Sequence, residues 1–157
     1  MKMFALGTLL CAVAAVSLQA TAQSAMVYKS PGSTQYGTHP ALPACAKIAV
    51  QDGNPTSGPA VISLKTAGPC TIPWHWHTGN ERLIIVHGSP KLEMKDMPAA
   101  MAHDGDFLLM PAKSTHQFSA DGPVELYIVT DAPFDIHYVN STGTEIPPEQ
   151  AIKTSGQ

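Results

Sequence analysis

The sequence has few charged residues and few proline-free windows long enough for a helix. Only 13% of the 157 residues are charged, whereas 44% are hydrophobic, and this balance excludes a disordered chain. The chain contains 14 prolines, and a proline inside a helix costs ~3 kcal/mol. Together these features exclude an all-helical bundle or a coiled coil.

The sequence also lacks a basic surface. Its formal net charge is −3, and Arg82 is the only arginine. Proteins that bind nucleic acids neutralise phosphates with clustered lysine and arginine side chains. We therefore expect no nucleic-acid partner.

The N-terminus has the pattern of a secretory signal peptide. Lys2 precedes an apolar run at 4–16 that is too short to span a bilayer. Ala20-Thr21-Ala22 then forms a small-x-small cleavage site. We expect residues 1–22 to be removed near Ala22, leaving a periplasmic or secreted protein without a stable membrane anchor.

Two cysteines remain after such cleavage, Cys45 and Cys70. An even pair in an oxidising compartment predicts a disulfide. The alternative is two unpaired buried thiols. A functional thiol is disfavoured, because nothing marks either cysteine as activated.

Short apolar runs separated by Gly, Pro, Asn and Asp turns predict an all-β, antiparallel fold of about nine short strands. Residues 23–44 are rich in Pro, Gly, Ser and Thr, and we expect an extended arm that lies on the domain or on a partner subunit. We expect residues 141–157 to form a flexible tail, and residues 98–103 are the one candidate helical turn. The predicted strands occupy 46–50, 60–65, 71–77, 81–87, 91–94, 107–110, 116–119, 124–130 and 134–139.

The segment Trp74-His75-Trp76-His77 carries the strongest chemical signal. Side chains alternate between the two faces of a strand, so His75 and His77 point to the same side, about 6–7 Å apart. Glu81 follows a short turn and faces the same interior if the next strand returns antiparallel. His116 is the best candidate for a further ligand from a distant strand.

These residues resemble the two motifs of the cupin superfamily. The first motif has Gly, His-x-His, Glu and Gly, with six residues between Glu and the last Gly. The second has Gly, five residues, Pro, and His four or five residues later. The matching residues are Gly68, His75, His77, Glu81 and Gly88 for the first motif, and Gly105, Pro111 and His116 for the second.

The resemblance covers residues 45–140 and implies an antiparallel jelly-roll β-barrel with a metal inside. It implies one transition-metal ion per chain, held by His75, His77, Glu81 and His116. Three imidazoles and one carboxylate suit Fe, Cu, Mn, Zn or Ni, with Cu or Fe favoured, and a location outside the cytoplasm leans toward copper by the Irving–Williams order. Lys113 occupies a position at which the second motif often has glycine.

Other residues near the motifs have two interpretations each. His87 either lines the pocket from the inward face of its strand or is an ordinary barrel histidine. Trp74 and Trp76 point away from the metal and either pack or form a flat platform for a sugar ring. A further group can hold soft Cu(I) or simply cap the barrel mouth, and it consists of Met94, Met97, Met101 and His103.

The function that the resemblance implies is a metal-dependent oxidoreductase that uses O2 or peroxide. Its substrate would be a small organic, phenolic or carbohydrate molecule, and Glu81 would act as a ligand or as a base. Two alternatives stay open, a non-catalytic metal-binding or sensing module and a metal-dependent sugar isomerase or lyase. We also expect a homodimer, because the outer barrel face offers an apolar strip of Ile84, Val86, Trp74 and Trp76.

Overall fold

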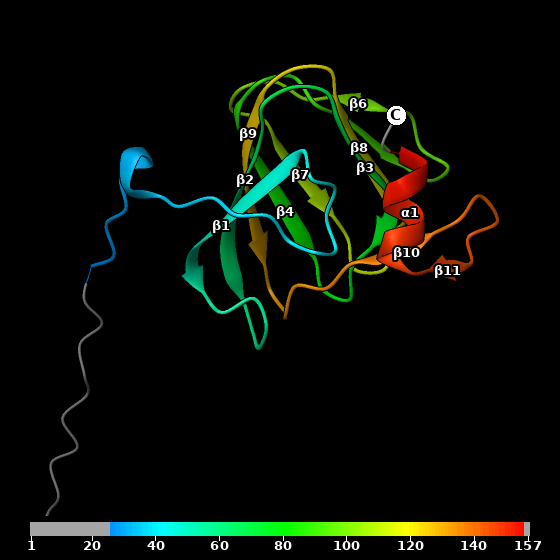
Figure 1. Cartoon of the computed structure of the whole chain (residues 1–157), viewed down its shortest axis with the longest axis horizontal. Coiled ribbons are helices and arrows are strands. Elements are labelled where there is room, and N and C mark those ends of the chain that lie inside the picture. Colours follow the sequence, from blue (N-terminus) through cyan, green and yellow to red (C-terminus); the bar gives the residue numbers. More distant parts are fainter. Residues whose placement is uncertain (1–25, 156–157) are drawn as a thin grey trace, which may run out of the picture.

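The computed structural model describes residues 26–155 as two antiparallel β-sheets packed face to face (Figure 1). The expected signal peptide and its cleavage site lie outside the described residues. The five-stranded sheet has the order β1 (Ala46–Gly53), β2 (Ala60–Thr66), β9 (Val124–Thr130), β4 (Glu81–His87) and β7 (Phe107–Met110). The six-stranded sheet has the order β11 (Glu145–Ile146), β10 (His137–Val139), β3 (Cys70–Trp76), β8 (His116–Ala120), β5 (Lys91–Met94) and β6 (Ala100–Met101).

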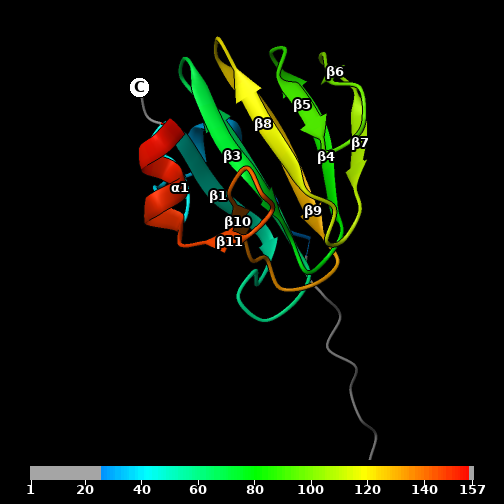
Figure 2. The ribbon, with the colours of Figure 1, turned by 90° about the vertical axis from the view of Figure 1, so that its right-hand side faces the viewer.

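The architecture is the predicted all-β jelly roll. Neighbouring strands in both sheets pair antiparallel, and the two sheets enclose one interior (Figure 2). Eleven strands form instead of about nine, because two pairs of residues add short edge strands, β6 and β11. The candidate helical turn at 98–103 is wrong, since Ala100–Met101 pairs with β5.

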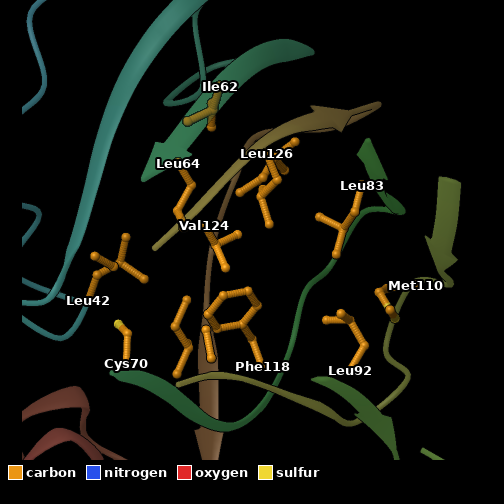
Figure 3. Close-up of a cluster of buried hydrophobic side chains, with 14 of the residues drawn as sticks. Leu42, Ile62, Leu64, Cys70, Leu83, Leu92, Met110, Phe118, Val124 and Leu126 are labelled. Atoms are coloured by element: carbon orange, nitrogen blue, oxygen red, sulfur yellow. The ribbon is translucent and has the colours of Figure 1, made fainter. Parts of the chain in front are cut away.

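The core consists of side chains from the inner faces of both sheets (Figure 3). Leu64 and Leu126 come from the five-stranded sheet, and Ile72 and Phe118 come from the six-stranded sheet. Burying each such side chain contributes about 1.5–3 kcal/mol. Burial of the apolar side chains on the inner faces of both sheets therefore holds the two sheets together.

Two glycines of the predicted motifs have backbone conformations that explain why glycine occupies these positions. Gly88 has φ +96°, and a Cβ there would lie 2.4 Å from the carbonyl oxygen of Pro123. Gly105 has φ +90°. Residues with a Cβ rarely adopt these angles, so glycine allows the tight turns after β4 and before β7.

Residues 141–155 form regular structure, which corrects the expected flexible tail at 141–157 over the part that the structure describes. It forms β11 and a helix, α1 (Pro148–Ser155), which packs against β3 and β10 (Figure 1). Ala151 is buried in the core cluster, and Ile146 and Ile152 pack against it. These three apolar side chains hold the segment against the domain, although its polar and proline-rich composition suggested a flexible tail. No helix within residues 26–155 has the length and apolar character needed to cross a membrane.

The described part of the N-terminal arm lies on its own domain. It contains a 3-10 helix at Pro31–Ser33, and Gly37 pairs with Ile48 of β1. Leu42 is buried in the core, and the carbonyl oxygen of Ala41 accepts a hydrogen bond of 2.8 Å from the hydroxyl of Tyr138. The arm is therefore an integral part of the fold.

The predicted disulfide is present. Cys45 directly precedes β1, and Cys70 is the first residue of β3. The two are bonded, with their Cα atoms 5.6 Å apart. Such a bond is compatible with an oxidising compartment.

Candidate metal centre

Three histidines converge at one end of the barrel interior. His75 lies near the end of β3, His77 directly follows that strand, and His116 begins β8. His75 and His116 are register partners across the two strands. One ring nitrogen from each of the three lies within 4.8 Å of the others. The predicted convergence of these side chains is therefore observed.

A bulge in β3 shifts the inward–outward alternation of its side chains just before the site. The register with β8 shifts between Ile72 and His75, so both residues face inward although they are three apart. Pro73 lies within the bulge, where its missing N–H costs no ladder hydrogen bond. The carbonyl oxygen of Pro73 accepts a hydrogen bond from Nδ1 of His75 at 2.6 Å. The bulge thus places and orients the first histidine.

Backbone carbonyls orient the other two rings in the same way. Nδ1 of His77 donates to the carbonyl oxygen of Asp135, and Nδ1 of His116 donates to that of Ser114 at 2.8 Å. A carbonyl can only accept, so Nδ1 carries a proton in each ring, and in the neutral form of the ring Nε2 keeps its lone pair. This is the tautomer that binds a metal through Nε2.

The Nε2 atoms of His77 and His116 test whether a metal fits this site. Both are buried, and neither has a hydrogen-bond partner. Buried polar atoms without partners are rare in proteins, because leaving them unpaired costs ~1–3 kcal/mol. A transition-metal ion bonded to both lone pairs would remove this cost, so the donor set fits a metal.

Glu81 lies beside the three histidines but outside their 4.8 Å group. Its Oε2 is 3.5 Å from Nε2 of His77 and 3.3 Å from Nε2 of His116, without the geometry of a hydrogen bond. Glu81 begins β4 and is 6% exposed. The site therefore draws its residues from both sheets.

The electrostatics of this cluster favour a neutral His75 and an ionised Glu81. Burial lowers the pKa of His75 well below its usual value, and His116 and His77 lower it further. Burial alone would raise the pKa of Glu81, but the neighbouring His77 and His116 outweigh burial and hold it far below normal. Burial likewise opposes protonation of His77, yet Glu81 and the Asp135 carbonyl raise its pKa.

The space next to these side chains is small. One cavity of about 30 Å³ is lined by His75, Glu81 and His116 together with apolar core residues. A second, of about 20 Å³, is bordered by His77 and by Phe134, whose ring centroid is 4.8 Å from that of His77. Each has room for one molecule of about the size of water.

His87 does not line this site, which corrects the expectation that it faces the pocket. Its side chain is 67% exposed, with Nδ1 3.7 Å from a carboxylate oxygen of Asp104. A bulge between Ile85 and His87 in the pairing of β4 with β9 interrupts the alternation of the strand. The phase that places Glu81, Leu83 and Ile85 inside therefore ends before His87.

Trp74 and Trp76 point outward as expected, but they do not share a face with Ile84 and Val86. The tryptophans lie on β3 of the six-stranded sheet, whereas Ile84 and Val86 lie on β4 of the five-stranded sheet. The expected single apolar strip is therefore wrong. Trp76 is also no open platform, because its ring stacks on His137 with centroids 3.9 Å apart and planes 5° from parallel.

Sequence reasoning missed Asp135 and Ser114, whose carbonyls orient two of the histidines. A backbone acceptor leaves no signal in the residue type. The candidate Cu(I) ligands differ in their exposure to solvent. Met97 and Met101 are exposed, whereas Met94 is half-buried. His103 makes a 3.2 Å contact with the hydroxyl of Ser89.

The sequence matches the family model described as a cupin domain (Cupin_2) over residues 65–130. This range contains His75, His77, Glu81 and His116. A search of curated proteins finds no match.

Several solved structures share the fold at low sequence identity. The polyketide cyclase RemF from Streptomyces resistomycificus aligns with a TM-score of 0.64 at 13% identity, over 81% of this chain and 98% of that chain. A cupin-2 domain, Rru_A2000 from Rhodospirillum rubrum, aligns with a TM-score of 0.59 at 15% identity, over 74% of this chain and 81% of that chain. An RmlC-like cupin from Shewanella frigidimarina aligns with a TM-score of 0.58 at 13% identity, over 69% and 92% of the two chains.

The domain match, the shared fold and the three-histidine site agree with one another. Residues 65–130 match the cupin domain, and the chain as described has the cupin fold.

Proposed function

We propose that this cupin binds one transition-metal ion per chain through His75, His77 and His116, and that the loaded protein is an oxidoreductase using O2 or peroxide. The observation that carries the proposal is the pair of buried, unpartnered Nε2 atoms of His77 and His116. Copper and iron are the favoured metals, and manganese, zinc and nickel accept the same donors. Bound there, copper or iron would supply one-electron redox chemistry and Lewis acidity.

The chain's own residues have three tasks in such a reaction. Carbonyl acceptors hold the imidazole rings with Nε2 toward the centre. Apolar side chains such as Ile72 and Phe118 keep bulk water away from it. Glu81 is ionised, so it can be a fourth ligand or accept a proton from the substrate.

The small cavities limit what reaches the centre. Spaces of about 30 and 20 Å³ admit molecules of the size of water or O2, whereas an organic, phenolic or carbohydrate substrate needs more room. A small organic substrate at the edge of the site fits the proposal best. The same enclosure favours a second candidate, a non-catalytic module that binds or senses metal.

The test starts with metal analysis of the purified protein, followed by reloading with Fe(II), Cu(II) or Zn(II). We expect the iron or copper form to consume O2 or peroxide in the presence of a small organic or phenolic substrate, and the zinc form not to. A His75→Ala/His116→Ala variant is the control for metal bound elsewhere. Tight metal binding without turnover would support the sensing module, and turnover with zinc would support an isomerase or lyase.

Glu81→Gln separates the two roles of this carboxylate. Loss of a base leaves the metal bound and lowers turnover by ~10²–10⁴-fold. Loss of a ligand lowers metal affinity as well. Measuring metal content and turnover on the same preparation distinguishes them.

Export and dimerisation belong to the same proposal. The N-terminal pattern ending at Ala22 and the Cys45–Cys70 disulfide support export, and mass spectrometry of the exported protein should give an N-terminus at or near Gln23. An exposed apolar group on the five-stranded sheet supports a homodimer, and sedimentation at micromolar concentration tests it. The group consists of Ile84, Val86, Phe107 and Leu109.

A further inference from the structure

A pocket of about 190 Å³ lies on the outer surface of the six-stranded sheet. Trp74 forms one wall, and because side chains alternate along β3, this ring faces away from His75 and the metal centre. Thr115, the residue before His116, and Lys95, just after β5, form further walls. None of the three histidines of the candidate metal centre lines this pocket, which lies on the opposite face of the sheet.

The walls of this pocket are held by hydrogen bonds within the protein. The backbone N–H of Lys95 donates to the carbonyl oxygen of Thr115 at 2.9 Å. On the other side, Oδ1 of Asn140 accepts hydrogen bonds from the backbone N–H groups of Thr142 and Thr144, at 3.0 and 2.9 Å. These contacts fix the turn between β10 and β11, so the pocket is formed before a ligand arrives.

The polar groups in the pocket are available to a ligand. The Lys95 ammonium lies against the β10–β11 turn, 3.8 Å from the position of a Cβ at Gly143. None of the ion pairs among the described residues includes Lys95. The hydroxyls of Thr115 and Ser141 likewise take part in none of the side-chain hydrogen bonds of residues 26–155. One unpaired cation and two hydroxyls therefore surround an indole ring.

We propose that this pocket binds a small ring compound that carries one carboxylate. The ring would pack on Trp74, since flat apolar faces stack on aromatic side chains. The carboxylate would pair with Lys95 and accept a hydrogen bond from Thr115 or Ser141. Aromatic acids and sugar acids both have this chemistry.

Trp74 is the tryptophan that a ligand can reach. Trp76 is already stacked on His137, so it offers no free face on that side. The sugar-platform interpretation of the two tryptophans therefore reduces to Trp74, and the adjacent lysine adds a requirement for negative charge. The proposal does not depend on the metal or on catalysis, because the pocket lies on the opposite face of the sheet.

The experiment is a calorimetric or NMR titration of the full mature protein with two acids, 4-hydroxybenzoate and galacturonate, and with their uncharged counterparts, phenol and galactose. We expect at least one acid to bind with a Kd of about 1 mM or tighter, and its uncharged counterpart to bind at least ~5-fold more weakly. Which acid binds distinguishes an aromatic from a sugar ligand. Absence of binding by both acids would overturn the proposal.

Two variants place the bound acid. Lys95→Gln should weaken binding of the acid by at least ~5-fold without changing binding of the uncharged counterpart. The matched control is Lys47→Gln, on β1 of the other sheet, which should leave both unchanged. Trp74→Phe should retain partial affinity, since it keeps an aromatic face. Equal binding by wild type and Lys95→Gln would contradict the proposal.

A carboxylate can also bind a metal, so the titration is repeated after treatment with a chelator. Unchanged binding supports the outer pocket. Loss of binding with the chelator would assign the acid to the metal centre and overturn this inference while leaving the proposed function intact.

Discussion

The backbone carbonyl oxygen of Asp135 accepts a hydrogen bond from Nδ1 of His77, a residue 58 positions earlier in the chain. The side chain of Asp135 is itself anchored, since Oδ1 accepts the backbone N–H of Thr78 at 2.8 Å and Oδ2 accepts its hydroxyl. The segment that leads into β10 therefore holds one histidine ring of the site in place.

Replacing Asp135 by Ala should weaken metal binding although it removes no ligand. The variant frees the segment whose carbonyl orients His77, and losses of this kind typically cost 10–100-fold in metal affinity. Asp131→Ala is the matched control, because Asp131 accepts hydrogen bonds from Asn80 and Arg82 and contacts no histidine of the site. Competition against a chromophoric chelator measures the affinity, and equal losses in both variants would contradict the positioning role.

His116→Ala should lower metal affinity by at least ~10–100-fold, because it removes one of three converging donors. The matched control is His87→Ala, whose side chain is exposed and outside the site. Metal content after dialysis provides the measurement. Full metal occupancy in the His116→Ala variant would show that His116 is not a metal ligand.

Lys113→Gly should stabilise the protein or leave it unchanged, by up to about 1 kcal/mol. Lys113 has φ +61°, a left-handed conformation that costs residues with a Cβ ~1–2 kcal/mol and glycine almost nothing. The greater freedom of glycine in the unfolded chain offsets part of this gain. Lys113→Ala removes the charge but keeps the Cβ, so it should not stabilise. Urea unfolding midpoints distinguish the two variants, and a clear loss with glycine would contradict the argument.

Removing the disulfide with Cys45→Ser/Cys70→Ser should lower the free energy of unfolding by about 3 kcal/mol. The two cysteines are 25 residues apart, and the figure follows from the loop-closure entropy of the unfolded chain. Denaturant unfolding of the wild type with and without a reductant provides the measurement and its control. A change below about 1 kcal/mol would argue against this account.

His137 should make stability depend on pH. Burial acts to lower its pKa, but contacts with Glu145 and Asp135 outweigh burial and raise it above the ordinary 6.5. The protonated ring therefore stabilises the fold fully below the unfolded pKa, and this contribution is lost as the pH rises through the raised folded pKa. Because Glu145 is 58% exposed, we expect only about 0.2–1 kcal/mol.

The measurement is the difference in unfolding free energy between wild type and His137→Gln across about pH 5.5–8.5, the range in which histidine titrates. The difference should shrink as the pH rises. A difference that stays constant or grows would contradict the assignment.

The parts of the fold with a strong period were predictable from the sequence. The alternating residues of β2, β4 and β9 gave bounds close to those observed, and His75 and His77 share a face as their spacing indicated. The turns at Gly88 and Gly105 were also predictable, because a backbone conformation with positive φ strongly favours glycine.

Other features depend on contacts that a single sequence does not display. His87 was misplaced because a bulge after Ile85 shifts the strand's phase, and nothing in the residue types marks it. The tail after Asn140 was misjudged because α1 is stabilised by burial of Ala151 rather than by its own propensity. The assignment of β3 and β4 to different sheets, which separates Trp76 from Ile84, likewise follows from long-range pairing.

Strand β3 is linked to the other sheet near each of its two ends. Cys70, at the start of β3, is bonded to Cys45, which directly precedes β1 of the five-stranded sheet. His75, near the end of β3, lines the same cavity as Glu81 of that sheet. The first link is a disulfide, which an oxidant forms, and the second link would be made by a bound metal ion. A protein that binds metal only when folded gains stability with the logarithm of the free metal concentration. Chelation of the metal and reduction of the disulfide should therefore each lower the thermal unfolding temperature of this chain. Both treatments together should lower it further than either one alone.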